Sequence, residues 1–178
     1  MNVENTRRRL SAILAADVVG YSRLMAADEV GTLNALNHHK RTAFDPHVAR
    51  NNGRVVKLMG DGTLVEFFSV VDAVQCAMDI QQAAVDDDAS DITLRIGINL
   101  GDVIIDRDDI LGDGVNIAAR LESLAPPGGI CISRTVHDQL RGKTSQPMTA
   151  MGPQNVKNIP EPIHVWRVEI EGVSATEA

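Results

Sequence analysis

The chain has 178 residues, of which 44% are hydrophobic and 23% charged, and these are ordinary proportions for a globular protein. A net charge of −7 argues against sequence-independent nucleic-acid binding, and an aromatic content of 3% argues against base-stacking surfaces. No run approaches the roughly 20 apolar residues that a membrane span requires. We therefore expect one globular domain that binds neither nucleic acid nor membrane. An acidic chain can still bind a nucleotide, because metal ions bridge carboxylates to phosphates.

Two local features bear on the cellular compartment. Three arginines at 7–9 precede an apolar stretch of only seven residues, which Asp17 follows, so a buried strand after a basic tail is favoured over a signal peptide. Cys76 and Cys131 lie in apolar runs without the spacing of metal ligands, which favours buried thiols over a disulfide. We expect a cytoplasmic protein.

The first part of the chain predicts a β-α-β-β-α-β order. Its elements are a strand at 10–19, a helical stretch from 21 to about 52, strands at 54–59 and 63–68, a helix at 69–86, and strands at 92–99 and 102–105. Ser69 and Asp72 have the spacing of a capping box at the start of the second helix. This order is ferredoxin-like, with helices on one face of an antiparallel sheet.

A further unit follows this core. Its elements are a Gly-rich turn at 109–116, a helix at 115–124, a strand at 130–133, a short helix at 135–140 and a strand at 163–168. We predict an α+β domain over 10–170, with a ferredoxin-like βαββαβ core and additional C-terminal α/β elements. A flexible basic tail at 1–9 and a disordered tail at 171–178 are expected to flank it.

Two aspartates stand out by their positions. Asp17 interrupts the otherwise apolar strand at 10–19. Asp61 lies at the tip of a hairpin whose two strands would neighbour that strand in such a sheet. Two carboxylates converging at one end of a sheet repel each other, and a divalent cation relieves both the repulsion and the cost of burial. On spacing alone, a turn-forming Asp61 and a helix-capping Asp17 remain equally open.

Four segments occur in the order and spacing of a known family. AILAADVVGYSRL, VVKLMGDGTLVEF, RIGINLGDV and DDILGDGVNIAARLESLAPPGGICIS resemble the successive motifs of the class III adenylate/guanylate cyclase catalytic domain. The resemblance covers roughly residues 10–170. It implies the class III nucleotide cyclase fold and a head-to-tail homodimer whose active sites lie between the subunits.

The resemblance also implies a role for each motif residue in the reaction. Asp17 and Asp61 match the metal-binding aspartates, which hold two divalent ions, Mg²⁺ or Mn²⁺. Asn116 and Arg120 match the pair that orients the ribose and stabilises the transition state. Their i, i+4 spacing places both on one face of a helix, and a permanently charged guanidinium can meet the charge that builds on a phosphate.

Three further positions match substrate-binding residues of the family. Lys57 and Asp109 match the residues that read the base, and Lys157 matches a late phosphate-contacting lysine. Lysine donates hydrogen bonds and an ionised aspartate accepts them, which complements the ring nitrogen and amino group of adenine and opposes guanine. Leu111 stands where the family commonly has an aromatic residue, so we expect looser packing beside the base pocket.

The sequence therefore predicts an adenylate cyclase that converts ATP to 3′,5′-cyclic AMP and pyrophosphate. The alternative is a catalytically weak or inactive cyclase-like module that dimerises and binds nucleotide. A palm-type enzyme that makes cyclic di-GMP is disfavoured, because the chain has Met59-Gly-Asp-Gly-Thr63 in place of a GG[DE]EF turn. Since the domain fills the chain, we expect constitutive activity, a separate regulatory partner, or a place within a longer protein.

Overall fold

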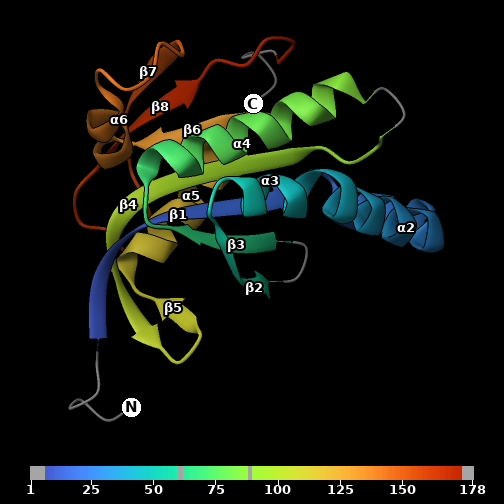
Figure 1. The fold of residues 1–178 in the computed structure, drawn as a ribbon, viewed down its shortest axis with the longest axis horizontal. Helices are drawn as coiled ribbons and strands as arrows, with labels where there is room; N and C mark the ends of the chain where they lie inside the picture. Colours follow the sequence, from blue (N-terminus) through green and yellow to red (C-terminus); the bar gives the residue numbers. More distant parts are fainter. Residues whose placement is uncertain (1–6, 60–61, 88–89, 174–178) are drawn as a thin grey trace.

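The computed structural model describes residues 7–59, 62–87 and 90–173 (Figure 1). In the first half of the chain, the elements are β1 (Arg7–Val18), α1 (Tyr21–Ala27), α2 (Glu29–His39), the π-helix η2 (Lys40–Phe44), α3 (Asp45–Arg50), β2 (Arg54–Met59), β3 (Gly62–Phe67) and α4 (Val70–Asp86). In the second half, they are β4 (Leu94–Asp106), β5 (Asp109–Leu111), α5 (Asp113–Leu124), β6 (Ile130–Ser133), α6 (Arg134–Leu140), β7 (Met148–Gln154) and β8 (Ile163–Val168).

The described strands form a mixed sheet in the order β2-β3-β1-β4-β6-β8-β7, with β5 paired to the far end of β4. The neighbours β2-β3, β3-β1 and β1-β4 are all antiparallel, so the predicted ferredoxin-like core is confirmed. The parallel pairing of β4 with β6 joins the C-terminal elements to this core.

Both faces of the sheet are covered, which corrects the expectation of helices on one face. Ala12, Leu14 and Ala16 of β1 belong to the buried cluster that α3 and α4 complete, while Ile13 and Ala15 point the other way and pack with α5. Figure 1 shows α3 and α4 in front of the sheet and α5 behind it. Alternate side chains of β1 therefore contribute to two hydrophobic cores, one on each face of the sheet. Helix α5, from the additional C-terminal unit, covers the second core.

The predicted cap of the second helix is confirmed. The Ser69 hydroxyl accepts a hydrogen bond from the backbone N–H of Asp72 at 3.2 Å, and α4 begins at the next residue, Val70. Residues such as Ala77 and Ile80 are then fully buried against the sheet. The long helical stretch expected before β2 is instead divided into α1, α2, η2 and α3.

Several boundaries differ from the sequence expectations. Arg7–Arg9, expected in a flexible tail, belong to β1 and pair with Val103–Ile105. The strands expected at 92–99 and 102–105 are one strand, β4, because Gly101 continues the ladder opposite Ser11. In the C-terminal tail expected to be disordered, Val173 packs against the core. Residues 174–178 lie outside the described part of the chain.

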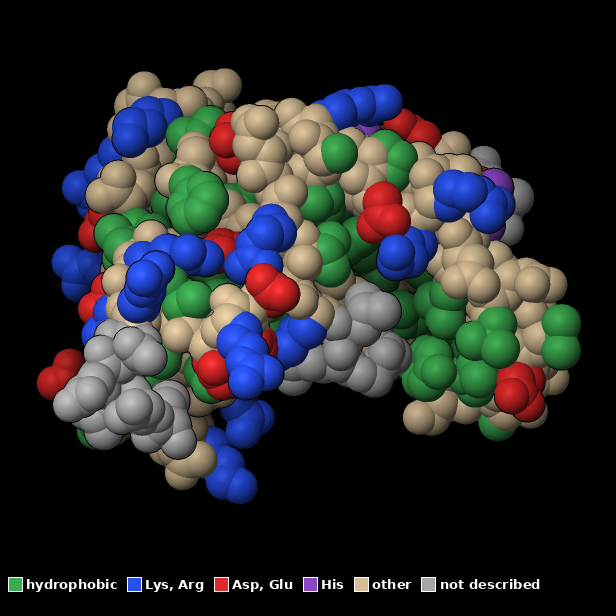
Figure 2. Space-filling view, turned by 60° about the horizontal axis from the view of Figure 1, so that its bottom comes forward, with side chains coloured by type: hydrophobic (Ala, Val, Ile, Leu, Met, Phe, Trp, Pro, Cys, Tyr) green, Lys and Arg blue, Asp and Glu red, His purple; other side chains and the backbone are tan. Residues whose placement is uncertain are grey.

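Two surface features complete the fold. Figure 2 shows apolar side chains gathered at the end formed by α1 and α2, where Val30 and Leu33 are exposed, while charges of both signs mix elsewhere on this face. None of the described helices is both long enough and apolar enough to cross a membrane.

Candidate active site

The position of α5 follows from two glycines of the motif segments. Gly97 of β4 lies so close to α5 that a Cβ atom there would be 2.2 Å from the backbone nitrogen of Glu122. Gly114 of α5 also lies close to β4, since a Cβ there would be 2.8 Å from the carbonyl oxygen of Asp102. With Ala118 and Leu121 buried on the sheet side, the opposite side of the helix faces solvent.

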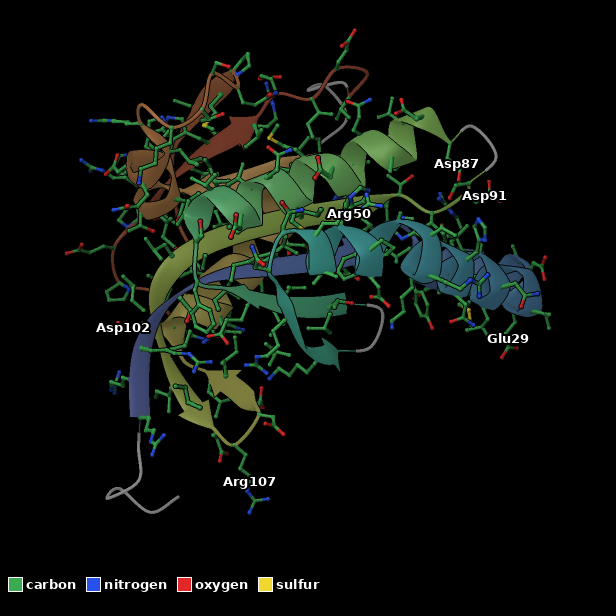
Figure 3. The ribbon with its side chains drawn as sticks, in the orientation of Figure 1. Glu29, Arg50, Asp87, Asp91, Asp102 and Arg107 are labelled. Carbon is green, nitrogen blue, oxygen red and sulfur yellow. The ribbon has the colours of Figure 1, made fainter. Side chains whose placement is uncertain are left out.

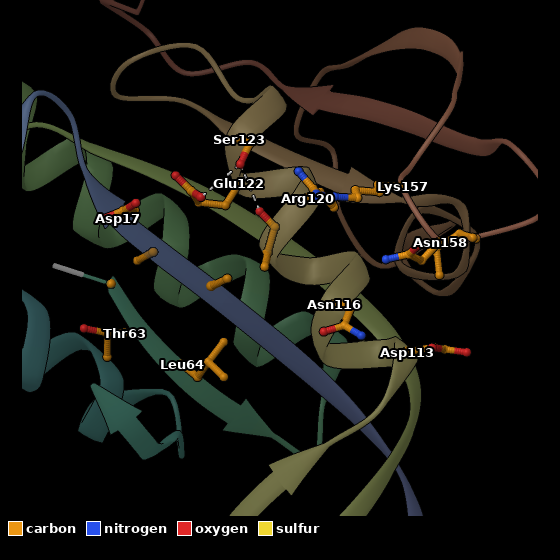
Figure 4. A pocket seen from close by; sticks show the side chains of 15 residues that line it. Asp17, Thr63, Leu64, Asp113, Asn116, Arg120, Glu122, Ser123, Lys157 and Asn158 are labelled. Atoms are coloured by element: carbon orange, nitrogen blue, oxygen red, sulfur yellow. Dashed lines mark hydrogen bonds between the residues drawn. The ribbon is translucent and has the colours of Figure 1, made fainter. Parts of the chain in front are cut away.

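The exposed side of α5 forms one wall of a cleft of about 460 Å³. Four predicted site residues line it: Asp17, Asn116, Arg120 and Lys157. Figure 4 shows Asp17 at the end of β1 on one side of the cleft, with Asn116 and Arg120 one turn apart on α5. The fold thus brings together side chains that are far apart in the sequence, since Asp17 and Lys157 are 140 positions apart.

Asp17 is half-buried where β1 ends. Its Oδ1 accepts a hydrogen bond from the backbone N–H of Val18 at 2.9 Å. The N-cap of α1 is Gly20, and none of the described side chains makes a capping hydrogen bond to that helix, so the alternative of Asp17 as a helix cap is wrong. Across the ladder, Asp17 pairs with Gly62 of β3. Asp61, the other predicted metal ligand, lies outside the described residues.

The carboxylate of Asp17 suits a hard divalent cation. Carboxylate oxygens such as those of Asp17 are the ligands that Mg²⁺ and Mn²⁺ prefer. In the described ranges, no group of three or more His, Cys, Asp or Glu side chains is placed to hold a metal. Asp17 therefore fits a metal site that needs further oxygen ligands from elsewhere, such as Asp61 or a phosphate.

Arg120 and Lys157 give the cleft a positive wall. Both side chains are exposed, and Figure 4 shows their ends pointing toward one another. Neither forms an ion pair with any of the residues that the structure describes. Unpaired cations on one wall of a cleft favour an anionic ligand, and a guanidinium can bind a phosphate with two parallel hydrogen bonds.

Lys57 and Asp109 pair with each other beside this cleft. Lys57 Nζ lies 3.0 Å from Asp109 Oδ1 and donates a hydrogen bond to Oδ2 at 3.3 Å. The backbone N–H of Ile110 donates to Oδ1 at 2.8 Å. Burial would raise the pKa of Asp109, but these two hydrogen bonds and the nearby ammonium outweigh it and hold the pKa below its ordinary value. The carboxylate is therefore ionised at neutral pH and acts as an acceptor.

Neither member of this pair lines the cleft itself. Lys57 lies opposite Leu64, which does line it, so the pair is on the same face of the sheet. Leu111, where an aromatic residue is common in the family, is 37% exposed.

The cleft also contains residues that the sequence reasoning missed. Asn158 lines it next to Lys157 and has a φ of 67°, a left-handed conformation that asparagine tolerates better than most residues. Asp113, Glu122 and Ser123 line it from α5. Residues 113 and 123 lie on the same helix face as Asn116 and Arg120, so helical spacing could have identified Asp113 and Ser123 from the sequence. No motif pointed to Asn158.

The cysteines and one histidine have structural roles. Cys76 and Cys131 are buried free thiols, as predicted, and burial raises the pKa of each to about 12. The His137 ring stacks on Trp166 with 4.2 Å between centroids, and His137 does not line the cleft.

Comparison with known proteins agrees with the motifs. A sequence model of the family described as "Adenylate and Guanylate cyclase catalytic domain" matches residues 3–169. The Rhizobium meliloti protein named "Putative adenylate cyclase 3" is 48% identical over 171 residues, covering 93% of this chain and 29% of that protein. An "Adenylate cyclase" of Streptomyces coelicolor is 34% identical over 140 residues, covering 77% of this chain and 35% of that protein. The chain spans about a third of the length of these curated relatives.

A solved structure shares the fold closely. The crystal structure of an adenylate/guanylate cyclase/hydrolase from Silicibacter pomeroyi is 46% identical and superimposes with a TM-score of 0.85. The match covers 92% of this chain and 98% of that one. The chain therefore belongs to the family of adenylate and guanylate cyclase catalytic domains.

Proposed function

We propose that the domain is an adenylate cyclase, which converts ATP to 3′,5′-cyclic AMP and pyrophosphate. The observation that carries this proposal is the cleft in which Asp17, Asn116, Arg120 and Lys157 meet. Its carboxylate side suits a metal and its cationic side suits phosphates, which is the charge pattern that a metal-bound nucleoside triphosphate requires.

The preference for adenine rests on the Lys57–Asp109 pair. Lys57 would donate a hydrogen bond to an acceptor nitrogen of the adenine ring, and Asp109 would accept one from the adenine amino group. Guanine has the opposite polarity at these two atoms, so it would leave both protein groups without partners. The names of the Rhizobium and Streptomyces relatives support the same substrate.

Asp17 and Asp61 would hold the divalent metals, Mg²⁺ or Mn²⁺. When bound, such ions make a hydroxyl group more acidic and neutralise phosphate charge. The ribose 3′-oxygen forms a bond to the α-phosphorus as its proton passes to solvent, the bond from that phosphorus to the bridging oxygen breaks, and pyrophosphate leaves. Asn116 orients the ribose, Arg120 meets the charge on the α-phosphate, and Lys157 binds the departing phosphates.

We further propose that the active unit is a head-to-tail homodimer with two equivalent sites. Each site would form where the clefts of two copies face each other, with Asp17 and Asp61 from one copy and the base, ribose and phosphate residues from the other. The side chains of Lys57 and Asp109 are partly exposed, and Asn116 and Arg120 are exposed, so a second copy can reach all four.

The test is to identify the product formed from ATP and from GTP with Mg²⁺ or Mn²⁺, by mass spectrometry. We expect cyclic AMP from ATP in excess over cyclic GMP from GTP. Arg120→Ala should reduce kcat by about a hundredfold, as losses of single transition-state donors do. Arg50→Ala removes an exposed arginine on α3 (Figure 3) and serves as the control. A folded parent that binds ATP without turnover would indicate the inactive module instead.

A further inference from the structure

A buried carboxylate lies on the same face of the sheet as the Lys57–Asp109 pair. Glu66 of β3 is 1% exposed and accepts hydrogen bonds from three side chains. Arg9 Nε donates to Oε2 at 2.8 Å, the Ser11 hydroxyl donates to Oε2 at 2.6 Å, and Arg54 Nη2 donates to Oε1 at 2.8 Å. A buried charge with this many partners has a fixed position, because moving it would leave ionised groups unpaired.

Arg54 extends this cluster to the hairpin formed by β4 and β5. While its Nη2 binds Glu66, its Nη1 donates to the backbone carbonyl of Asp108 at 3.2 Å. Asp108 lies in the turn between the two strands and immediately precedes Asp109, the first residue of β5. Figure 3 shows this hairpin projecting below the sheet, with Arg107 at its tip pointing into solvent. The two ends of one planar guanidinium thus connect the buried carboxylate of β3 to the projecting hairpin.

The Lys57–Asp109 pair is too exposed to fix this hairpin alone. Its side chains are 29% and 40% exposed, and ion pairs between such side chains contribute about 0–1 kcal/mol to stability. A base-reading pair must nevertheless present its donor and acceptor at a set spacing. The ladder to β4 and the fully buried Ile110 restrain the middle of β5. A restraint at its first residue, Asp109, must come from the adjacent turn, where Arg54 binds the carbonyl of Asp108.

An irregularity of β2 places Arg54 and Lys57 on one face. Arg54 pairs with Glu66 and Lys57 pairs with Leu64, with a register shift between Val55 and Lys57. In a regular strand, residues three apart would point to opposite faces, and the extra residue of a bulge restores them to the same face. The anchor and the pair are thereby set side by side.

We propose that Glu66 and Arg54 are positioning residues for base recognition, which hold the β4–β5 hairpin so that Asp109 stays in register with Lys57. Neither residue needs to touch the nucleotide. This inference rests on the proposed function, because it assumes that the pair reads the base.

Arg54→Ala tests the proposal, because Arg54 is 43% exposed and Glu66 keeps its bonds to Arg9 and Ser11. We expect kcat/KM for ATP to fall by about tenfold through KM, as the loss of one charged hydrogen bond implies, with kcat/KM for GTP little changed. Arg54→Lys should give little rescue, since a single ammonium cannot hold both acceptors as the planar fork does. Arg50→Ala is the matched control.

Hydrogen–deuterium exchange gives a second readout that does not depend on activity. Amides of the β4–β5 hairpin should exchange faster in Arg54→Ala than in the parent, while those of α4 should not change. An inactive parent would refute the proposed function and leave the exchange result to test the anchor. An active parent whose ATP-to-GTP ratio is unaltered by Arg54→Ala, or fully restored by Arg54→Lys, would overturn the positioning role.

Discussion

Glu66 should make the stability of the domain depend on pH in a defined range. Burial raises the pKa of this carboxyl, but its hydrogen bonds from Arg9, Ser11 and Arg54 more than compensate and lower the pKa from 4.5 to about 2. A carboxyl group with these values contributes roughly 3 kcal/mol to the free energy of unfolding at pH 7. Because the pKa is lower in the folded state, this contribution is complete above the unfolded-state value and is lost as the pH falls toward 2.

The measurement is urea unfolding, followed by circular dichroism, of the parent and of Glu66→Gln. The variant should unfold more easily at pH 7 by roughly 3 kcal/mol, and linkage reduces this difference to roughly 1.5 kcal/mol at pH 3. Glu161→Gln, which alters an exposed glutamate, controls for the general effect of acid. If the difference between parent and Glu66→Gln is the same at pH 7 and pH 3, the cluster does not hold an ionised Glu66.

The remaining predictions concern catalysis. If the metals act on the reacting oxygens, Asp61→Asn should reduce cyclic AMP formation by at least about a hundredfold. Its circular dichroism spectrum should match that of the parent. Substantial activity of this variant would refute the two-metal assignment. Replacing Lys57 by Glu together with Asp109 by Thr should lower the ATP-to-GTP ratio of kcat/KM by at least about tenfold, because the donor and acceptor are reversed. A double variant that keeps the parental ratio would show that these residues do not read the base.

Local patterns were sufficient to predict most of the core. The alternating and apolar runs indicated the strands, and Ser69 with Asp72 located the start of α4. β7 was missed, because Gly152 and Pro153 interrupt its pattern and the ladder shifts register beside them. Arg7 to Arg9 were assigned to a tail because charge argues against a strand, yet Arg9 is paired with a glutamate 57 positions away.

The cleft was predictable only as far as the motifs reached. Asn116 and Arg120 share a helix face by their spacing, so their approach to one another follows from the sequence alone. The extra residue of β2 that turns Lys57 to the face of Glu66 depends on pairing with β3, which no local pattern encodes. For the same reason, the link from Glu66 through Arg54 to Asp108 became visible only with the tertiary structure.

Mixing two inactive variants shows whether the cyclase site is shared between two chains. Asp17→Ala and Arg120→Ala should each retain about a hundredth of the parental activity or less, since every site of either homodimer carries a lesion. In a mixed dimer one site carries both lesions and the other none, so equal amounts that exchange subunits freely should recover about a quarter of the parental cyclic AMP production. Asp17 and Arg120 also line one cleft within a single chain. If subunits exchange and the mixture stays inactive, each chain uses its own cleft and the shared-site account is wrong.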